Sequence, residues 1–230
     1  MAIRYINNPI KLFLERLLAF LSIILIFPLL LFLFALCSLS TKSFGIYIQH
    51  RIGRYGRRFK CLKFKTMMDQ KNSKQSSIAN LNFSRITKFG LLIRKYKLDE
   101  LPQLFNICIG QMSFIGPRPD VPGYANNLKG EFKKLLLINP GITSSASIFF
   151  SNEEELFKEQ ENMEKYNKNY IWPLKVFLNK HYLLEASFLY DIIIILATLG
   201  IFRNTFENYL KIKVSSFILK VNIINKFMFY

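Results

Sequence analysis

Two adjacent carboxylates, Asp99 and Glu100, stand in a basic stretch of the chain, Arg94–Leu104 (RKYKLDELPQL). Neighbouring residues of one helix point about 100° apart, so the two carboxylates are not expected to share a proton. Two separate roles fit better: one carboxylate attacks or holds a substrate, and the other binds metal or tunes charge. The cations Arg94 and Lys97 favour ionised carboxylates, and an ionised Asp can attack phosphorus. A charged helix N-terminus held in salt bridges is the alternative interpretation.

Three further cations have the chemistry of phosphate ligands. Arg118 lies between two prolines on a segment that cannot be helical, and a rigid frame suits a planar, bidentate guanidinium. Lys63 and Lys65 alternate with apolar residues as they would on a strand, which places both on one face as candidate substrate-binding residues. An ordinary loop arginine and a solvated strand face remain the alternatives.

The charge balance restricts the partners. The chain has 32 Lys and Arg against 15 Asp and Glu, a formal net charge of +17, which implies nucleic acid, anionic lipid headgroups or a phosphorylated substrate. Hydrophobic residues make up 51% of the chain, so burial in a core or a bilayer is expected rather than a disordered tail. No nucleic-acid-binding motif is present, and phosphates would repel the acidic pair without a metal. Nucleic acid is therefore not an expected partner.

The chain carries no charged residue between Arg16 and Lys42. As a helix, this segment is long enough to cross a hydrocarbon core of about 30 Å, and it lacks a signal-peptide cleavage pattern, so we expect a retained membrane anchor. Pro28, which follows Phe27, predicts a kink near its middle. Both flanks are basic, so the charges do not assign the two ends to sides of the membrane. An ordinary span and a re-entrant hairpin both satisfy these features.

Local patterns predict the elements that position the acidic pair. Ile46–Ile48 and Phe59–Leu62 are predicted strands of a hairpin around the Gly53–Gly56 turn. Thr87–Arg94 is a predicted amphipathic helix with Thr87 or Ser84 as its cap. Pro102 belongs in the first turn of the next helix, which places Asp99 and Glu100 at or next to its N-terminus. Three other segments are a polar loop at 69–82, a charged helix at 153–166, and an apolar helix at 187–201 that suits a core or the membrane interface.

Together these segments resemble the bacterial sugar transferases, the small monotopic phosphoglycosyl transferases. The matching pieces follow the family order across roughly residues 5 to 200 and are far more specific together than singly. They are the proline-broken apolar helix (17–39), QHRIG (49–53), FKCLKFKTM (59–67), ITKFG (86–90), LDELPQLFN (98–106) and GQMSFIGPRP (110–119).

The resemblance implies an α+β, mostly helical fold. An N-terminal re-entrant membrane helix-break-helix, broken at Phe27–Pro28, a small β-hairpin and membrane-interface amphipathic helices would surround a cytoplasmic catalytic core. The expected organisation is a membrane anchor at 1–42, a catalytic domain at 43–202, and a basic hydrophobic tail of unassigned role at 203–230.

The resemblance also implies an enzyme at the cytoplasmic face of the bacterial inner membrane. It would transfer a phosphosugar from a UDP-sugar to undecaprenyl phosphate and release UMP, as the first membrane step of surface glycan assembly. Asp99 would be the nucleophile of a covalent phosphosugar intermediate, and Glu100 would support it through Mg²⁺ held by both carboxylates. Arg94 and Arg118 would contact phosphate or the acidic pair. Anionic lipids and downstream glycosyltransferases are expected partners, and a non-catalytic membrane scaffold is the alternative function.

Overall fold

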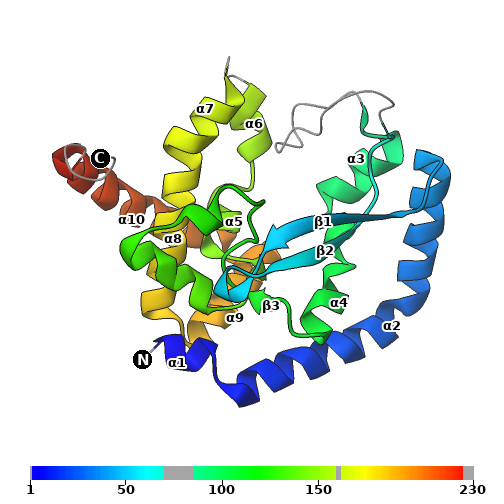
Figure 1. The fold of residues 1–230 in the computed structure, drawn as a ribbon, viewed down its shortest axis with the longest axis horizontal. Coiled ribbons are helices and arrows are strands. Elements are labelled where there is room, and N and C mark those ends of the chain that lie inside the picture. The colour runs from blue at the N-terminus through cyan, green and yellow to red at the C-terminus, as the bar shows by residue number, and fades with distance from the viewer. Residues whose placement is uncertain (1, 70–84, 159–161, 225–230) are drawn as a thin grey trace. The chain divides into compact units, whose positions relative to one another are not determined.

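The computed structural model describes residues 2–69, 85–158 and 162–224. Nearly all of the predicted polar loop at 69–82, and residues 225–230 of the predicted tail, lie outside these ranges. The chain forms two compact units, residues 4–142 and residues 143–230 with 1–3, called here the N-terminal and C-terminal units. Helices dominate both units, and the strands form two small sheets, so the mostly helical fold with a small sheet is confirmed (Figure 1).

The elements up to the end of the N-terminal unit alternate between helices and short strands. In chain order they are α1 (Ala2–Ile6), α2 (Pro9–Thr41), β1 (Ile46–Ile52), η1 (Arg54–Gly56), β2 (Arg58–Phe64), α3 (Lys88–Lys95), η3 (Leu98–Glu100), α4 (Gln103–Cys108), β3 (Ser113–Ile115), η4 (Ala125–Asn127), η5 (Gly130–Leu137) and β4 (Gly141–Thr143).

Strands β1 and β2 form the predicted hairpin. They are antiparallel, with Ile46 opposite Phe64 and Ile52 opposite Arg58, and both strands extend beyond their predicted ends. The connection includes η1, where Tyr55 has a φ of 59°, a left-handed conformation that closes the turn. Helix α3 is also confirmed. The side chain of its N-cap, Thr87, accepts a hydrogen bond from the Gly90 amide at 2.9 Å.

Helix α2 is 33 residues long and remains helical through Pro28, although its ribbon curves along its length (Figure 1). Asn8 caps it by accepting a hydrogen bond from the Ile10 amide, and Pro9 occupies the first turn. It is the one helix of the described residues that is long and apolar enough by itself to cross a membrane. Much of its apolar surface is exposed, including Phe13, Leu14, Leu18, Leu21, Ile24, Leu25, Leu31, Phe32 and Leu39.

The opposite face of α2 is part of the core of the N-terminal unit. Its buried residues are spread along most of the helix and pack with side chains of β2, α3 and α4 in one cluster. The cluster contains Ala19, Ile23, Leu30, Leu33, Cys37, Phe59, Cys61, Phe64, Ile93, Leu104, Ile107 and Met112. A helix that is apolar all round but buried on only one face requires another apolar medium for its exposed face.

Polar contacts fasten both ends of α2 to the same unit. Near its start, Glu15 pairs with Lys11 at 2.7 Å and accepts a hydrogen bond from Ser113 at the beginning of β3. Near its end, Ser40 Oγ lies 3.5 Å from the Thr87 hydroxyl at the start of α3. The backbone of Gly45 also packs against this end, because a Cβ there would lie 2.5 Å from the Phe34 carbonyl oxygen. The unit therefore holds the helix at both of its ends.

The C-terminal unit is a helical bundle. Its helices are α5 (Ser145–Phe149), α6 (Glu153–Lys158), α7 (Met163–Tyr166), η6 (Asn167–Ile171), α8 (Trp172–Glu185), α9 (Phe188–Thr198) and α10 (Arg203–Ile224). Buried Phe206, Leu210 and Val214 form one stripe of α10, which packs against α5, α8 and α9. The hydroxyl of buried Tyr182 donates to the buried carboxylate of Asp191 at 2.8 Å and links α8 to α9.

Two predicted helices belong to this bundle. The charged helix expected at 153–166 corresponds to α6 and α7, with residues 159–161 between them outside the described ranges. The apolar helix expected at 187–201 is α9, capped by Ser187. Helices α9 and α10 are bent by 117° at their junction, where Gly200 and Phe202 both have positive φ. Ile194 and Ala197 face the core, while Phe188, Leu189 and Leu199 are exposed.

Candidate active site

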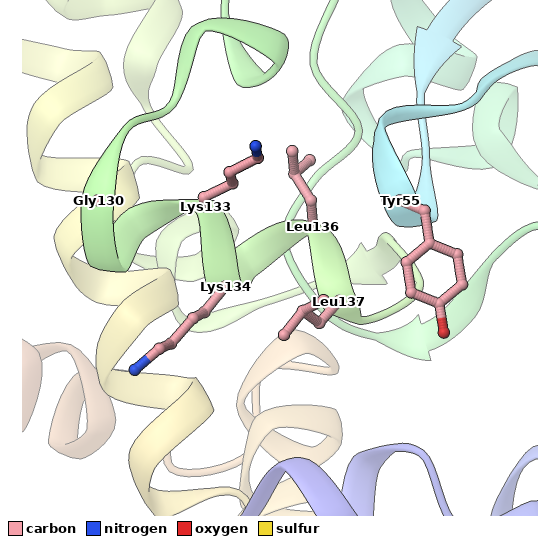
Figure 2. Close-up of a pocket in the computed structure, with 6 residues that line it drawn as sticks. All are labelled: Tyr55, Gly130, Lys133, Lys134, Leu136 and Leu137. Atoms are coloured by element: carbon pink, nitrogen blue, oxygen red, sulfur yellow. The ribbon is translucent and has the colours of Figure 1, made fainter.

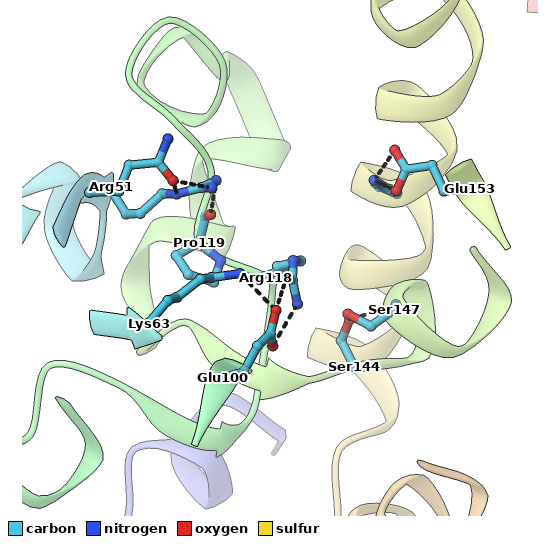
Figure 3. Close-up of polar contacts among 10 residues, drawn as sticks. Arg51, Lys63, Glu100, Arg118, Pro119, Ser144, Ser147 and Glu153 are labelled. Carbon is cyan, nitrogen blue, oxygen red and sulfur yellow. Dashed lines mark hydrogen bonds and ion pairs between the residues drawn. The ribbon is translucent and has the colours of Figure 1, made fainter. Parts of the chain in front are cut away.

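Three elements of the N-terminal unit bring charged side chains together around Glu100 (Figure 3). Glu100 ends η3, Lys63 comes from β2, and Arg118 comes from the loop after β3. The Lys63 ammonium donates to Glu100 Oε1 at 2.8 Å. The Arg118 guanidinium donates through Nη1 to Oε2 at 3.2 Å and through Nη2 to Oε1. Both oxygens of this carboxylate are therefore engaged by cations.

Glu100 is held in its ionised form. Its side chain is only 10% exposed, and burial alone would oppose ionisation, but the charges of Arg118 and Lys63 outweigh burial and hold the pKa of Glu100 well below its usual range. Glu100 in turn raises the pKa of Arg118, which stays cationic. The Arg118 side chain keeps 42% of its surface exposed. It can therefore meet an anionic ligand while Glu100 holds it in place.

Asp99 differs from its neighbour. Among the residues that the structure describes, no hydrogen bond or ion pair engages its carboxylate, which is half-buried. Burial raises the pKa of Asp99, while the nearby charges of Lys63, Arg94 and Arg118 act in the opposite direction. A carboxylate without a fixed partner among three cations retains its lone pairs for a substrate. The two carboxylates thus have separate environments, as their spacing predicted.

The backbone between α3 and α4 presents the acidic pair. Lys97 adopts a left-handed conformation with φ of 55°, and its carbonyl accepts the Glu100 amide at 3.2 Å. Pro102 follows as the N-cap of α4, which confirms that Asp99 and Glu100 lie next to a helix N-terminus. They form a separate 3₁₀ turn rather than the first turn of α4 itself.

Asn106 sets the position of this segment against the hairpin. It is almost fully buried. Its side chain forms hydrogen bonds with the backbone of β2, as a neighbouring strand would. Its Oδ1 accepts the Leu62 amide at 3.1 Å, and its Nδ2 donates to the Lys60 carbonyl at 2.8 Å. Lys63 follows directly on that strand, so these bonds fix the strand that carries Lys63 relative to Glu100.

The loop of Arg118 is non-helical, as its prolines predicted, and is fixed by backbone contacts on both sides. The Pro117 carbonyl accepts the Gly141 amide at 2.9 Å, and the Pro119 carbonyl accepts a hydrogen bond from Arg51 Nη1 at 3.0 Å. Gly141 must be glycine for this approach, because a Cβ there would lie 2.1 Å from the Gly116 nitrogen. Arg118 therefore extends from a loop with little freedom.

Arg51 is a functional candidate that the sequence reasoning did not single out. Its Nε and Nη2 donate to Gln49 Oε1 at 2.9 and 2.6 Å, and its third donor holds the loop at Pro119 (Figure 3). Burial and the neighbouring positive charge of Arg118 lower the pKa of Arg51. The available signal was the alternation of β1, which places Gln49 and Arg51 on one face. Their partner is 68 residues away, which no local pattern shows.

Only some of the predicted site residues lie together in the structure. It brings Lys63, Glu100 and Arg118 together, with Asp99 beside them and Arg94 near enough to act on the Asp99 carboxylate. The remaining predicted substrate ligand pairs elsewhere: Lys65 lies beyond the end of β2 and binds Asp69 at 2.6 Å. Phe27 and Pro28, the predicted break, lie within α2.

The donor set limits how a metal ion can be held. No group of three or more His, Cys, Asp or Glu side chains suited to a metal occurs within the described ranges. Mg²⁺ needs fewer, because it is commonly held by one or two carboxylates together with substrate phosphates and water. The oxygens of Glu100 already accept three hydrogen bonds, whereas Asp99 is available. The residues therefore fit an ion shared by Asp99 and a phosphorylated substrate, but not one bound by Glu100 while its ion pairs persist.

Comparison with known proteins identifies the family of this chain. The family described as bacterial sugar transferase matches residues 6–204, and this chain belongs to that family. The match contains the hairpin, the acidic pair, the Arg118 loop and helices α2 to α9, and ends at the start of α10. The family predicted from the sequence, a class of transferase enzymes, is confirmed.

Named relatives are similar over different parts of their length. A UDP-glucose:undecaprenyl-phosphate glucose-1-phosphate transferase of Klebsiella pneumoniae is 32% identical over 76% of this chain, which spans only 38% of that enzyme. The exopolysaccharide production protein ExoY of Sinorhizobium fredii is 32% identical over 86% of this chain and 87% of its own length. A UDP-N-acetylgalactosamine-undecaprenyl-phosphate N-acetylgalactosaminephosphotransferase of Aeromonas hydrophila is 32% identical over 61% of this chain and 35% of its own. The names of the first and third of these relatives specify different sugars, and the name of the second specifies none.

Proposed function

We propose that this protein transfers a phosphosugar from a UDP-sugar to undecaprenyl phosphate, with release of UMP, as a membrane step of bacterial glycan assembly. The observation that carries the proposal is the contrast within the acidic pair. Asp99 has no fixed partner among the described residues, and Glu100 fixes Lys63 and Arg118 beside it. The names of the relatives supply the substrate classes and leave the sugar open.

In the first step, a carboxylate oxygen of Asp99 attacks the phosphorus that bears the sugar. An acyl phosphate bond forms, the bond from that phosphorus to the bridging oxygen breaks, and UMP leaves with the electron pair. Charge accumulates on the phosphate oxygens during this displacement. Arg118 and Lys63 are positioned cations that can neutralise it, since Glu100 already holds both. Glu100 thus acts by orienting cations.

In the second step, a phosphate oxygen of undecaprenyl phosphate attacks the same phosphorus. The acyl phosphate bond breaks, the Asp99 carboxylate is restored, and the lipid diphosphate sugar is released as a substrate for later glycosyltransferases. Asp99 requires no proton transfer in either step, provided that it begins ionised. Mg²⁺, when bound by Asp99 and the substrate phosphates, would supply additional charge neutralisation.

The lipid substrate explains the exposed apolar face of α2. We propose that this helix enters the membrane from the cytoplasmic face and returns to it, with the bend at Phe27–Pro28. The support is that α2 is fastened near both ends, by Glu15 and by Ser40, to the unit that contains the acidic pair. A straight perpendicular span would carry one end about 30 Å away, across the bilayer. The boundaries proposed at 42/43 and 202/203 remain predictions.

The test is UMP release by the purified full chain with a panel of UDP-sugars, undecaprenyl phosphate and Mg²⁺. Asp99→Asn should lower release by at least about a thousandfold, because the amide is not a nucleophile toward phosphorus. With the lipid omitted, the wild type should gain the mass of one phosphosugar, and Asp99→Asn should not. Near wild-type release by Asp99→Asn would exclude the covalent mechanism, and no release by the wild type with any UDP-sugar of the panel would favour the scaffold function.

The pH profile provides a second measurement of the same step. Burial raises the pKa of Asp99 above its usual value of 3.8, and attack requires the ionised form. The rate should therefore be full at a pH well above the raised pKa and fall as the pH drops through it. This fall should begin at a higher pH than for an exposed Asp.

A further inference from the structure

A pocket of about 380 Å³ lies in the N-terminal unit and is lined by residues of η1 and η5 (Figure 2). It opens to solvent. Six residues line it: Tyr55, Gly130, Lys133, Lys134, Leu136 and Leu137. The catalytic proposal uses none of them.

The walls combine cationic and apolar groups. Residues three apart lie above one another in a 3₁₀ helix, so Lys133 lies beside Leu136 and Lys134 beside Leu137, on opposite sides of η5 (Figure 2). Both lysines are exposed, and no ion pair with either occurs in the part of the chain that the structure describes. Glu131 is the one acidic residue of η5 itself.

Tyr55 completes the pocket with an amphipathic ring. Its side chain is 59% exposed, and the Arg54 guanidinium lies 4.8 Å from the ring centre, which adds a third cation at the rim. Tyrosine and leucine beside arginine and lysine are the combination that proteins present at the membrane surface, where apolar groups meet acyl chains and cations meet phosphates.

Hydrogen bonds connect the pocket to the start of the membrane helix. The Leu137 carbonyl accepts from Asn7 Nδ2 at 3.2 Å and from Arg54 Nε at 2.9 Å. Asn7 lies two residues before α2, and the uncharged part of α2 begins at Leu17, eight residues or about 12 Å along the helix from Pro9. The pocket therefore lies near the polar end of the anchor, close to the level of the lipid headgroups.

We propose that this pocket binds the headgroup of an anionic phospholipid of the surrounding bilayer. Lys133 and Lys134, one on each side of η5, and Arg54 at the rim supply positive charge that attracts the phosphate, and Leu136, Leu137 and Tyr55 contact the glycerol and the first acyl carbons. The proposal rests on the membrane location that the proposed function requires. A lipid held here ties η5 and the start of α2 to the same leaflet and so fixes how the unit is oriented on the membrane.

The test compares lipid binding by full-length variants in phosphatidylcholine nanodiscs that contain a minor fraction of phosphatidylglycerol. The readout is the number of phosphatidylglycerol molecules retained per protein after transfer to detergent, measured by native mass spectrometry. Lys133→Gln/Lys134→Gln should weaken retention by about tenfold or more, given the contribution of each lysine near an anionic surface. Lys60→Gln/Lys88→Gln removes the same charge from exposed lysines outside the pocket and should retain the lipid as the wild type does.

Equal retention by the two double variants would overturn the proposal. So would equal loss of the lipid from both, since that indicates only general charge attraction. Competition by inorganic phosphate alone, at concentrations that leave phosphatidylcholine bound, would also overturn it, because the site would then bind free phosphate. UMP release by Lys133→Gln/Lys134→Gln in detergent should equal that of the wild type. Lipid retention and UMP release therefore test the proposed lipid site and the proposed activity separately, so that either proposal can be disproved without the other.

Discussion

At the scale of single residues, the two roles proposed for the acidic pair follow from its contacts, because cations neutralise one carboxylate and not the other. Glu100 accepts hydrogen bonds from Lys63 and Arg118, whereas Asp99 faces cations without a fixed bond among the described residues. The pKa values of these two adjacent acids therefore shift in opposite directions: the pKa of Glu100 is lowered and the pKa of Asp99 is raised. The sequence predicted two roles, but only the contacts show why Glu100 is better suited to orienting cations than to holding a metal.

Glu100→Gln should therefore reduce both stability and catalysis. The substitution leaves Lys63 and Arg118 facing a neutral amide, at a cost of about 2 to 3 kcal/mol at neutral pH. This is below the usual cost of breaking a buried pair, because the Arg118 side chain is 42% exposed and water screens it. UMP release should fall by at least about tenfold, since Arg118 loses its orientation. Thermal unfolding and initial rates measure the two effects.

The pH dependence identifies the source of that stability. A lowered pKa means that ionised Glu100 stabilises the fold above its usual pKa of 4.5, and that this contribution is lost as the pH falls through the lower folded value. The melting temperatures of wild type and Glu100→Gln should converge in acid. Glu207→Gln, in a partly exposed pair with Arg203 within one helix, serves as the control and should shift melting little at any pH. A gap between wild type and Glu100→Gln that stays constant into acid would contradict the ion-pair explanation.

At the scale of elements, short-range patterns predicted which segments fold but not how they meet. The strand patterns of β1 and β2 and the Thr87 cap are local signals that were confirmed, whereas Pro102 is the N-cap of α4 rather than a residue of its first turn. The contacts that build the site join residues 37 and 68 positions apart, from Lys63 to Glu100 and from Arg51 to Pro119. A strand pattern could not show that β2 would end at Phe64 and leave Lys65 to pair with Asp69.

The loop of Arg118 allows a test of positioning by Arg51. Arg51→Lys keeps the charge but loses the geometry with which one guanidinium reaches both Gln49 and the Pro119 carbonyl. The kcat for UMP release should fall about tenfold or more with little change in KM, if the loop must be held during the displacement. Gln49→Ala should have a smaller effect of the same kind, while Gln49→Glu, which keeps an acceptor for Arg51, should restore most of the rate. A change in KM alone would show that Arg51 only binds substrate.

At the scale of the whole molecule, the proposed reaction requires that a water-soluble nucleotide sugar and a membrane lipid meet at one carboxylate. Helix α2 has an exposed apolar face, and its opposite face belongs to the core of the unit that contains Asp99. Helix α2 is thus an integral part of the unit that contains Asp99. If α2 entered the membrane separately from α3 and α4, then Ala19, Ile23, Leu30 and Leu33 would be lost from that core.

This arrangement predicts that both ends of α2 are accessible from the same side of the membrane. In a Cys108→Ser background, where Cys37 and Cys61 are buried, single cysteines at Arg4→Cys and Phe44→Cys bracket the helix at exposed positions. Lys60→Cys, on β2 of the same unit, marks its side. A membrane-impermeant maleimide should leave all three unlabelled in intact cells and label all three in inverted vesicles. Labelling of Phe44→Cys in intact cells, with Arg4→Cys protected, would establish a span, and the contact of Glu15 with Ser113 could not then exist in the membrane.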